Sequence, residues 1–215
     1  MAAAKAKNES IEIPAIELAD AHIEIIGDTP LIMHKWSEKA KREMLEKQMK
    51  VAKSKGHDAK DPVADFIESI YWLEGEPEEK NEEGFEKAIA SGNARFGFPS
   101  VAFKASAVSG GYRAGVTKNK TSMNAAFHIQ GDMVEIIGTP IMREDMVRIG
   151  MGTADIRFRG EFPEWRAILP ITYNTGVVTL EQLCNLFNLG GFSVGVGEWR
   201  PEKSGSYGMY HVGSF

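Results

Sequence analysis

The pattern of apolar residues predicts a wide amphipathic helix near the end of the chain, at Leu180–Leu189. Its apolar residues recur at the spacing that places them on one face of a helix. These residues are Leu180, Leu183, Cys184, Leu186, Phe187 and Leu189. Thr179 is placed to cap the start of this helix, and Gly190-Gly191 to end it.

Alternation of apolar and polar residues predicts strands before and after a long middle segment. We expect strands at Ala21–Ile26, Met133–Ile137, Met146–Ile149, Ala154–Gly160 and Trp165–Tyr173. The second and third of these are predicted to pair as a hairpin around Gly138-Thr139-Pro140. The phrase EIIG-TP-IM in that hairpin repeats EIIGDTPLIM at Glu24–Met33, and either two related half-domains or chance similarity accounts for the repeat.

The middle of the chain has helical patterns. Ser37 precedes a largely polar helix that is predicted from Glu38 to about Lys55. Val63–Leu73 has a strong apolar face, and Asp61 is placed to cap it.

A further helix is predicted near Val101–Gly110. The polar, basic stretch Ala114–Asn124 follows it without any periodicity. We expect this stretch to be a mobile loop, of the kind that becomes ordered on a bound strand.

A glycine-rich loop is predicted after the amphipathic helix. It contains Gly195, Gly197, Gly205 and Gly208, separated by basic and aromatic residues. Glycine permits positive φ angles and close approach of another backbone. Basic and aromatic side chains offer phosphate contacts and stacking faces. The alternative interpretation is a simple turn before a final strand.

Charge is distributed unevenly along the 215 residues, whose net charge is −5. Asp61–Ala90 has ten acidic residues and two basic ones, whereas Lys35–Lys60 has nine basic residues and four acidic ones. A net negative charge argues against a protein that binds nucleic acid over most of its surface. Because the acidic residues are concentrated in one block, the rest of the chain has room for a basic groove.

The composition indicates a cytoplasmic protein. Cys184 is the only cysteine, so no intramolecular disulfide can form, as expected in a reducing compartment. No apolar run approaches the roughly 18 residues of a membrane span, and Met1–Ser10 lacks the apolar core of a signal peptide. We expect no metal and no cofactor. The histidines are scattered, and neither a Walker A sequence nor a dinucleotide fingerprint is present.

Three stretches, in this order along the chain, resemble the RAMP superfamily, the RNA-binding and RNA-processing proteins of CRISPR systems. Ile23–Leu31, IEIIGDTPL, resembles the first strand of the family, which ends in a Thr-Pro-Leu turn. Phe98–Tyr112, FPSVAFKASAVSGGY, resembles its Pro-Ser…Lys segment, which enters a central helix. Leu180–Val212 resembles its helix, glycine-rich loop and last strand.

We expect an α+β fold. The residue patterns support a sheet with two packing helices, and the resemblance implies that the sheet is ferredoxin-like or RRM-like and antiparallel. A single RAMP-like domain is expected to span residues 1–215. A helical insertion is expected at residues 35–95, after the first core strand, and a β-hairpin arm at residues 131–165.

The function that we expect is non-enzymatic binding of single-stranded nucleic acid by protomers that lie side by side along the strand. The resemblance is greatest to the backbone-forming subunits of CRISPR effector complexes, which implies RNA and adds other effector subunits as partners. Nothing in the residues excludes single-stranded DNA, as for a relative in a phage or mobile element. Phosphate contacts are predicted at Lys104, Arg113, Lys118, Lys120, Arg157, Arg159, Arg200 and Lys203. Stacking on bases is predicted for Trp199, Tyr207 and Tyr210.

Two other functions stay open. In the RNA-processing endoribonucleases of the superfamily, a histidine in the region of His34 is the general base on a ribose hydroxyl, and Lys35 would steady the transition-state charge. Because no aspartate or second histidine is visible nearby to orient His34, we expect no cleavage. The other alternative is a structural assembly protein whose glycine-rich loop packs against a neighbour.

Overall fold

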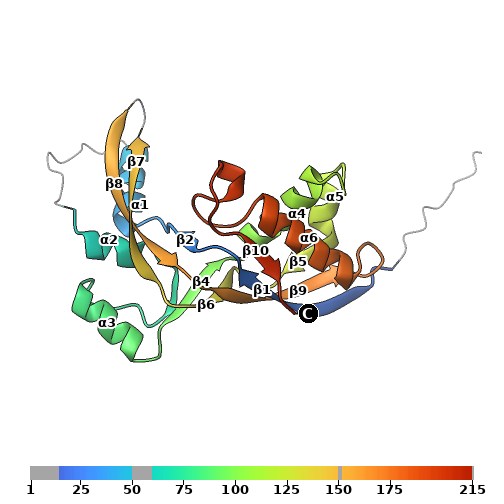
Figure 1. The fold of residues 1–215 in the computed structure, drawn as a ribbon, viewed down its shortest axis with the longest axis horizontal. Helices are drawn as coiled ribbons and strands as arrows, with labels where there is room; N and C mark the ends of the chain where they lie inside the picture. The colour runs from blue at the N-terminus through green and yellow to red at the C-terminus, as the bar shows by residue number, and fades with distance from the viewer. Residues whose placement is uncertain (1–14, 50–59, 150–151, 215) are drawn as a thin grey trace, which may run out of the picture.

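The computed structural model describes residues 15–49, 60–149 and 152–214, which fold as an α+β protein around an antiparallel sheet (Figure 1). The expected fold class is confirmed. The strands are β1 (Leu18–Gly27), β2 (Leu31–Met33), β3 (Trp72–Glu74), β4 (Arg95–Pro99), β5 (Phe127–Ile129), β6 (Met133–Ile137), β7 (Ile141–Ile149), β8 (Thr153–Phe162), β9 (Arg166–Asn174) and β10 (Tyr210–Val212). The helices are α1 (Glu38–Gln48), α2 (Pro62–Glu68), α3 (Glu82–Ala90), α4 (Ser100–Arg113), α5 (Lys120–Ala126) and α6 (Leu180–Ser193), with a short 3-10 turn, η1 (Pro201–Lys203).

Four strands and two helices form the ferredoxin-like core. The strands lie in the order β10-β1-β9-β6, and each neighbouring pair is antiparallel. In the chain, α4 lies between β1 and β6, and α6 lies between β9 and β10. β5 pairs with β9 just ahead of β6, and β4 and β3 extend the sheet beyond β6. This order and this placement of helices are those of a ferredoxin-like or RRM-like sheet.

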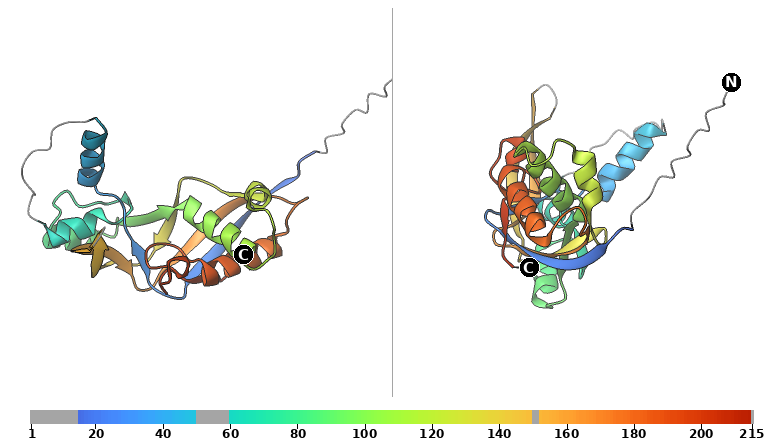
Figure 2. Two further views of the ribbon diagram at one scale, coloured as in Figure 1. Left: turned by 90° about the horizontal axis from the view of Figure 1, so that it is seen from above. Right: turned by 90° about the vertical axis from the view of Figure 1, so that its right-hand side faces the viewer.

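α4 and α6 lie side by side over one face of this sheet (Figure 2). Phe103 of α4 and Phe187 of α6 are fully buried in one apolar core with Ile23 and Ile25 of β1. Removal of such large apolar side chains from water is the main favourable contribution to folding. The core therefore fixes the helices, and with them the segments that enter and leave them.

The predicted end of the last helix at Gly190-Gly191 is wrong. The cap is confirmed, because Thr179 and Gln182 exchange hydrogen bonds at the start of α6, but the helix continues to Ser193. A Cβ atom at Gly110 of α4 would stand 2.5 Å from the backbone nitrogen of Gly190. The glycines are therefore required for close helix packing, and they do not reverse the chain.

A second sheet of three strands lies beside the core, with β8 between β2 and β7. β7 and β8 form a long hairpin that projects from the body (Figure 1). The predicted pairing of Met133–Ile137 with Met146–Ile149 is wrong, because β6 pairs with β4 and β9 in the core sheet. The turn after β6 leads the chain from one sheet into the other, so the two segments do not meet.

The repeated sequence phrase corresponds to two similar crossings between the sheets. β1 leads into β2, and β6 leads into β7. β2 and β7 then flank β8 on its two sides. In each copy of the phrase the glycine is closely packed: a Cβ atom at Gly27 would collide with the Trp165 side chain, and one at Gly138 would collide with the carbonyl oxygen of Glu164.

Between β2 and β4 the chain forms α1, α2, β3 and α3. The helix predicted from Glu38 to Lys55 is observed as α1, and its remainder falls partly on residues 50–59, which lie outside the described residues. Asp61 caps α2 as predicted, but α2 is shorter than expected. The chain after it becomes β3, because Trp72 pairs with Phe96 of β4 and packs against its ring.

The stretch Ala114–Asn124, predicted to be a loop, is partly helical. Asn119 accepts a hydrogen bond from the backbone nitrogen of Thr121 and begins α5. The sequence of α5 lacks a strong helical period, so Asn119, its N-cap, was the only local signal for this helix.

Candidate nucleic-acid interface

The residues from Val194 to Gly208, here called the glycine-rich segment, lie between the hairpin and the pair of helices α4 and α6 (Figure 1). Gly195, Gly197 and Gly208 have φ angles of 68°, 79° and 64°. These angles strain any residue with a Cβ atom. Backbone hydrogen bonds fasten the segment to the core, among them one from Gly208 N to Pro30 O at 2.8 Å. The segment therefore has a defined backbone conformation.

Trp199 lies near the middle of this segment in sequence. Its φ angle is 52°, in the left-handed region that a bulky residue rarely adopts. Its carbonyl accepts a hydrogen bond from Tyr207 N at 3.1 Å, and the carbonyl lies where a side chain at Gly205 would have to be. The side chain is 42% exposed. The segment thus holds a large aromatic side chain in solvent at the cost of backbone strain, a combination found at functional sites.

A groove of about 300 Å³ lies between α4 and the glycine-rich segment. Its lining includes Ser106 and Ser109 of α4, together with Arg200 and Glu202 of the glycine-rich segment. Tyr71 and Phe98 supply apolar surface to it, and His34 lines one end. The groove therefore has polar walls on both sides and an apolar part, as expected for a site that accepts a polar ligand with flat rings.

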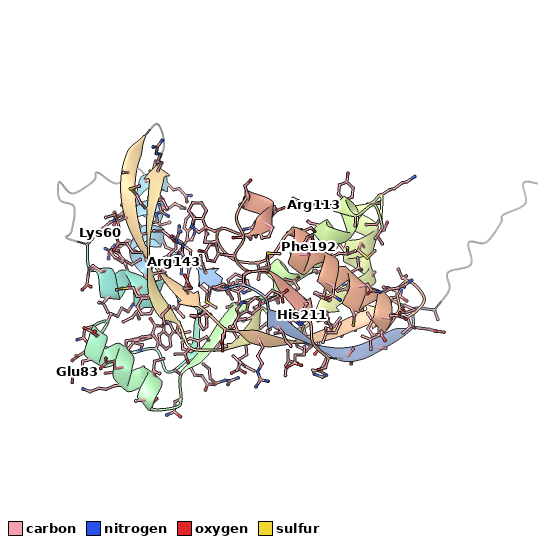
Figure 3. All side chains as sticks on the ribbon, in the orientation of Figure 1. Lys60, Glu83, Arg113, Arg143, Phe192 and His211 are labelled. Atoms are coloured by element: carbon pink, nitrogen blue, oxygen red, sulfur yellow. The ribbon has the colours of Figure 1, made fainter. Side chains whose placement is uncertain are left out.

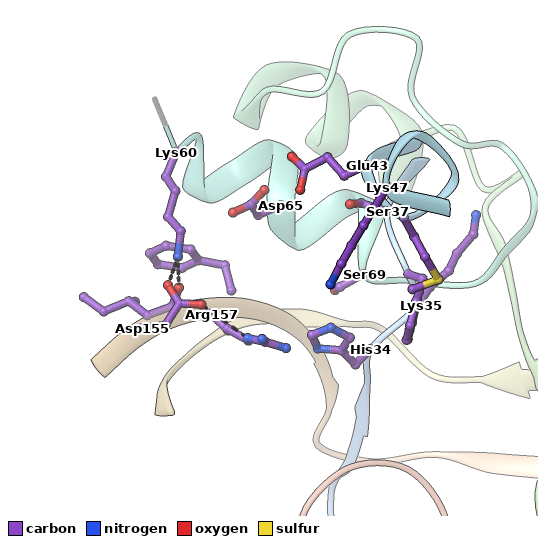
Figure 4. Close-up of a pocket in the computed structure, with 14 residues that line it drawn as sticks. His34, Lys35, Ser37, Glu43, Lys47, Lys60, Asp65, Ser69, Asp155 and Arg157 are labelled. Atoms are coloured by element: carbon purple, nitrogen blue, oxygen red, sulfur yellow. Dashed lines mark hydrogen bonds and ion pairs between the residues drawn. The ribbon is translucent and has the colours of Figure 1, made fainter. Parts of the chain in front are cut away.

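His34 also lines a second, larger cavity of about 690 Å³, which lies between the hairpin and helices α1 and α2 (Figure 4). Arg157, one of the predicted phosphate contacts, lines this cavity together with Lys35 and Lys47. Lys60 also lines it, but its ammonium group is bonded to Asp155, which lowers the pKa of that carboxyl group. The cavity is thus basic in part, with some of its positive charge neutralised.

Two predicted phosphate contacts, Arg113 and Arg200, converge on one carboxylate. Arg113 Nη2 donates to Glu202 Oε1 at 3.0 Å, and Arg200 Nη2 donates to Glu202 Oε2 at 2.9 Å. The hydrogen bonds from Arg200, and the charge of both arginines, hold the pKa of Glu202 below its usual value. We call Arg113, Arg200 and Glu202 the surface arginine cluster, because all three side chains are at least a quarter exposed.

Arg143, Asp145, Arg159 and Glu161, at the base of the hairpin, form a second group that we call the interior arginine cluster. Arg143 Nε donates to Asp145 at 2.9 Å, and Arg143 Nη1 donates to Glu161 at 2.6 Å. Arg159 Nη1 donates to Asp145 at 3.0 Å. The prediction that Arg159 contacts phosphate is corrected, because its side chain is only 5% exposed and already hydrogen-bonded within the protein.

His34 is attached to this interior cluster. Arg159 Nε donates to His34 Nδ1 at 2.8 Å. Because an arginine nitrogen can only donate, Nδ1 must accept, and the neutral ring then has its proton on Nε2. Burial, and next the charge of Arg159, lower the pKa of His34. In this arrangement the second ring nitrogen is a hydrogen-bond donor, whereas a general base needs a nitrogen without a proton.

The predicted stacking residues divide into three kinds of position. Trp199 is exposed, and one face of Tyr207 lies under the guanidinium of Arg143, 4.6 Å from its carbon to the ring centroid. The stacking prediction for Tyr210 is corrected, because this residue is 1% exposed and its hydroxyl donates to Ser106 Oγ at 3.0 Å. Burial raises the pKa of Tyr210. Tyr210 is therefore part of the core that supports the segment.

The predicted lysines lie around α4, α5 and η1. Lys120 Nζ is 3.2 Å from Oγ of Ser109, a groove residue, and lies 5.1 Å from the ring centroid of Tyr112. Lys104 lies near His128, and burial lowers the pKa of its ammonium group. Lys118 and Lys203 are exposed. Arg200 thus lines the groove, and Arg113 and Lys120 bond to its residues Glu202 and Ser109. Trp199 lies between the groove residues Glu198 and Arg200 in the chain, whereas Arg157 lies at the cavity beyond His34.

The face of the core sheet that α4 and α6 leave open has a different character. Exposed apolar side chains lie on it: Ile26, Ile137 and Ile168. Glu24 pairs there with Arg166 across a 3.7 Å gap. An RRM-like protein would bind RNA on this face through aromatic side chains, but this face offers isoleucines and carboxylates. Apart from Arg157 and Arg159 on the hairpin, the basic and aromatic residues that we predicted lie on the helices and the glycine-rich segment or next to them.

Sequence reasoning missed Arg143, Asp145 and Glu202. The alternation of charged residues along β7 and β8 was a usable signal for the first two, because it places opposite charges across a hairpin. Glu202 lies two residues after Arg200, and nothing in this spacing identifies the second arginine that it binds. Among the described residues, no three side chains of His, Cys, Asp or Glu are placed to hold a metal ion, and no helix is long and apolar enough to cross a membrane.

Fold and site together define an α+β protein with a ferredoxin-like sheet and a groove on its helix side. No family model matches the sequence, and no curated protein matches it. Among solved structures, the crystal structure of Cmr6 from Pyrococcus furiosus is similar over 93% of this chain and 100% of that chain, with 13% sequence identity and a TM-score of 0.36.

Proposed function

We propose that this protein binds single-stranded nucleic acid without cleaving it, along the groove between α4 and the glycine-rich segment. The observation that supports this most directly is Trp199, a half-exposed ring on a strained backbone that the glycine-rich segment holds in place. Stacking on an aromatic ring is tolerant of sequence, because every base has a π face. Arg200 lines this groove, and Arg113 and Lys120 bond to its residues Glu202 and Ser109, so the phosphates of a strand in the groove would pass near all three.

RNA is the preferred strand in this proposal, and protomers lie side by side along it. Both features come from the sequence resemblance to backbone-forming subunits of CRISPR effector complexes. The hydrogen bond that fixes the proton of His34 on Nε2 favours a binding role for that residue over base catalysis. His34 is then a donor to the bound strand at the junction of the groove and the larger cavity.

The test is binding of fluorescently labelled oligo(U) and oligo(dT), each about 30 nucleotides long, measured by anisotropy across a salt series. Affinity should fall as salt rises, with a logarithmic slope of magnitude about 0.7 for each phosphate neutralised. A flat plot would overturn the proposal. The oligo(U) should also remain intact after incubation with the protein in EDTA at neutral pH, and discrete products would favour the endoribonuclease instead.

A further inference from the structure

We infer that Arg113 and Arg200 form a binding site for a backbone phosphate, and that the carboxylate of Glu202 occupies this site until a strand displaces it. The inference rests on the proposed function, since it names what one part of the groove binds. It also adds a feature that the proposed function does not contain, namely a group of the protein that competes with its own ligand.

The geometry supports the inference because two guanidinium groups from different elements meet at one carboxylate. Arg113 ends α4, and Arg200 belongs to the glycine-rich segment. Glu202 Oε1 accepts from Arg113 at 3.0 Å, and Oε2 accepts from both Nε and Nη2 of Arg200, at 3.2 and 2.9 Å. A carboxylate and a phosphodiester each present two oxygens that share one negative charge. An arginine fork fits either group.

The arginines are also held by contacts that do not involve Glu202. Arg200 Nη1 donates to Gly197 O at 3.0 Å, and Arg113 Nη1 donates to Ser193 O at 3.4 Å. When the carboxylate leaves, these backbone carbonyls keep both guanidinium groups near their positions. The site is therefore preorganised for a second anion, which lowers the cost of binding.

Displacement of Glu202 has a low cost, because its ion pairs are near solvent. The side chains of Arg113, Arg200 and Glu202 are 45%, 29% and 27% exposed. Ion pairs at such exposure add little to stability. Glu202 and Arg200 both line the groove, so a strand that runs along the groove passes the site.

The first experiment compares Glu202→Gln with Glu198→Gln in anisotropy titrations with labelled oligo(U) of about 30 nucleotides. Glu198 lines the same groove, and in the described part of the chain its side chain forms no ion pair with Arg113 or Arg200. Both variants change the net charge equally. Glu202→Gln should bind on the order of threefold to tenfold more tightly than wild type at low salt, since two surface ion pairs no longer compete. Its salt slope should steepen by about 0.7 for each phosphate gained, and Glu198→Gln should change both quantities less.

The second experiment is a double-mutant cycle with Arg113→Gln. If Glu202 neutralises Arg113 in the free protein, Arg113→Gln should weaken binding only slightly in wild type and strongly in the Glu202→Gln background. Equal losses in both backgrounds would overturn the inference, because the gain in Glu202→Gln would then reflect overall charge. An equal gain from Glu202→Gln and Glu198→Gln would overturn it for the same reason.

These outcomes separate the inference from the proposed function. If wild type binds the strand with the expected salt slope and Glu202→Gln does not bind more tightly, the inference fails and the proposed function stands. If neither protein binds oligo(U) or oligo(dT) while both are folded by circular dichroism, both fail.

Discussion

The interior and surface arginine clusters contain the same chemical groups but differ in burial. Arg143, at the base of the hairpin, and Arg113, at the end of α4, lie on different sides of the glycine-rich segment (Figure 3). In the interior cluster, Asp145 and Arg159 are 8% and 5% exposed, and each hydrogen-bonds to more than one partner, while Glu161 is 14% exposed and Arg143, at the edge of the cluster, is 24% exposed. In the surface cluster, the least exposed side chain is still 27% exposed.

Burial separates the arginines that are available to a ligand from those that are not. A buried ion pair cannot exchange its partner without leaving a charge away from water, whereas an exposed pair can. The interior cluster therefore connects the hairpin to the core, and Arg143 extends it to the glycine-rich segment by lying over the ring of Tyr207. The surface cluster remains free to exchange one anion for another. Three predictions test this division.

The largest expected effect is on stability, from Asp145→Asn. This change leaves Arg159 buried with a positive charge that is no longer neutralised, which typically costs about 3–5 kcal/mol. The matched change in the surface cluster, Glu202→Gln, should alter the free energy of unfolding by less than about 1 kcal/mol. Urea denaturation of both variants measures the two values. Similar losses in the two variants would show that burial does not distinguish the clusters.

The second prediction concerns binding next to the surface cluster. Trp199→Ala should weaken binding of oligo(U) by about 1–3 kcal/mol for each base that stacks on the ring. Phe192→Ala is the control, because Phe192 is an aromatic residue that is 74% exposed on the last turn of α6, outside the glycine-rich segment. Anisotropy titrations give both affinities. Unchanged affinity of a folded Trp199→Ala protein would place the strand elsewhere.

The smallest expected effect is on the pH dependence of stability, through His34. Because burial and Arg159 lower the pKa of His34 in the folded protein, the unfolded chain takes up the proton first as the pH falls. The contribution of His34 is therefore fully present above the ordinary histidine pKa of about 6.5 and declines as the pH falls below it. His34→Asn keeps an acceptor for Arg159 but cannot titrate.

Urea denaturation of wild type and His34→Asn between about pH 7.5 and 5.5 checks this prediction. The stability of wild type should fall relative to the variant as the pH decreases. Parallel curves for the two proteins would mean that the folded state does not disfavour the charged form of His34.

Local sequence patterns predicted several elements of the fold correctly. The cap of α6 at Thr179 and the alternation that became β8 depend on residues within a few positions of one another. The α+β class also followed from such patterns, since helical and strand periods differ. Gly195, Gly197 and Gly208 of the glycine-rich segment were identified for the same reason, because positive φ angles are a property of single residues.

The candidate site depended on contacts that no local pattern contains. Arg113 and Glu202 are 89 residues apart in sequence, and Arg159 and His34 are 125 residues apart. Tyr210 and Trp199 looked alike as aromatic residues near glycines, yet one packs under α4 and the other projects into solvent. Whether each of these side chains is buried depends on how the helices and strands pack against one another.

The kinds of elements, the helix cap and the glycines at positive φ can be predicted from short segments of sequence, because each follows from the conformational preferences of a few neighbouring residues. The strand that pairs with β7, the arginines that are buried and the carboxylate that each arginine contacts depend on how distant elements pack. These outcomes depend on the free energy of removing particular side chains from water, and that free energy is defined only when distant elements pack together.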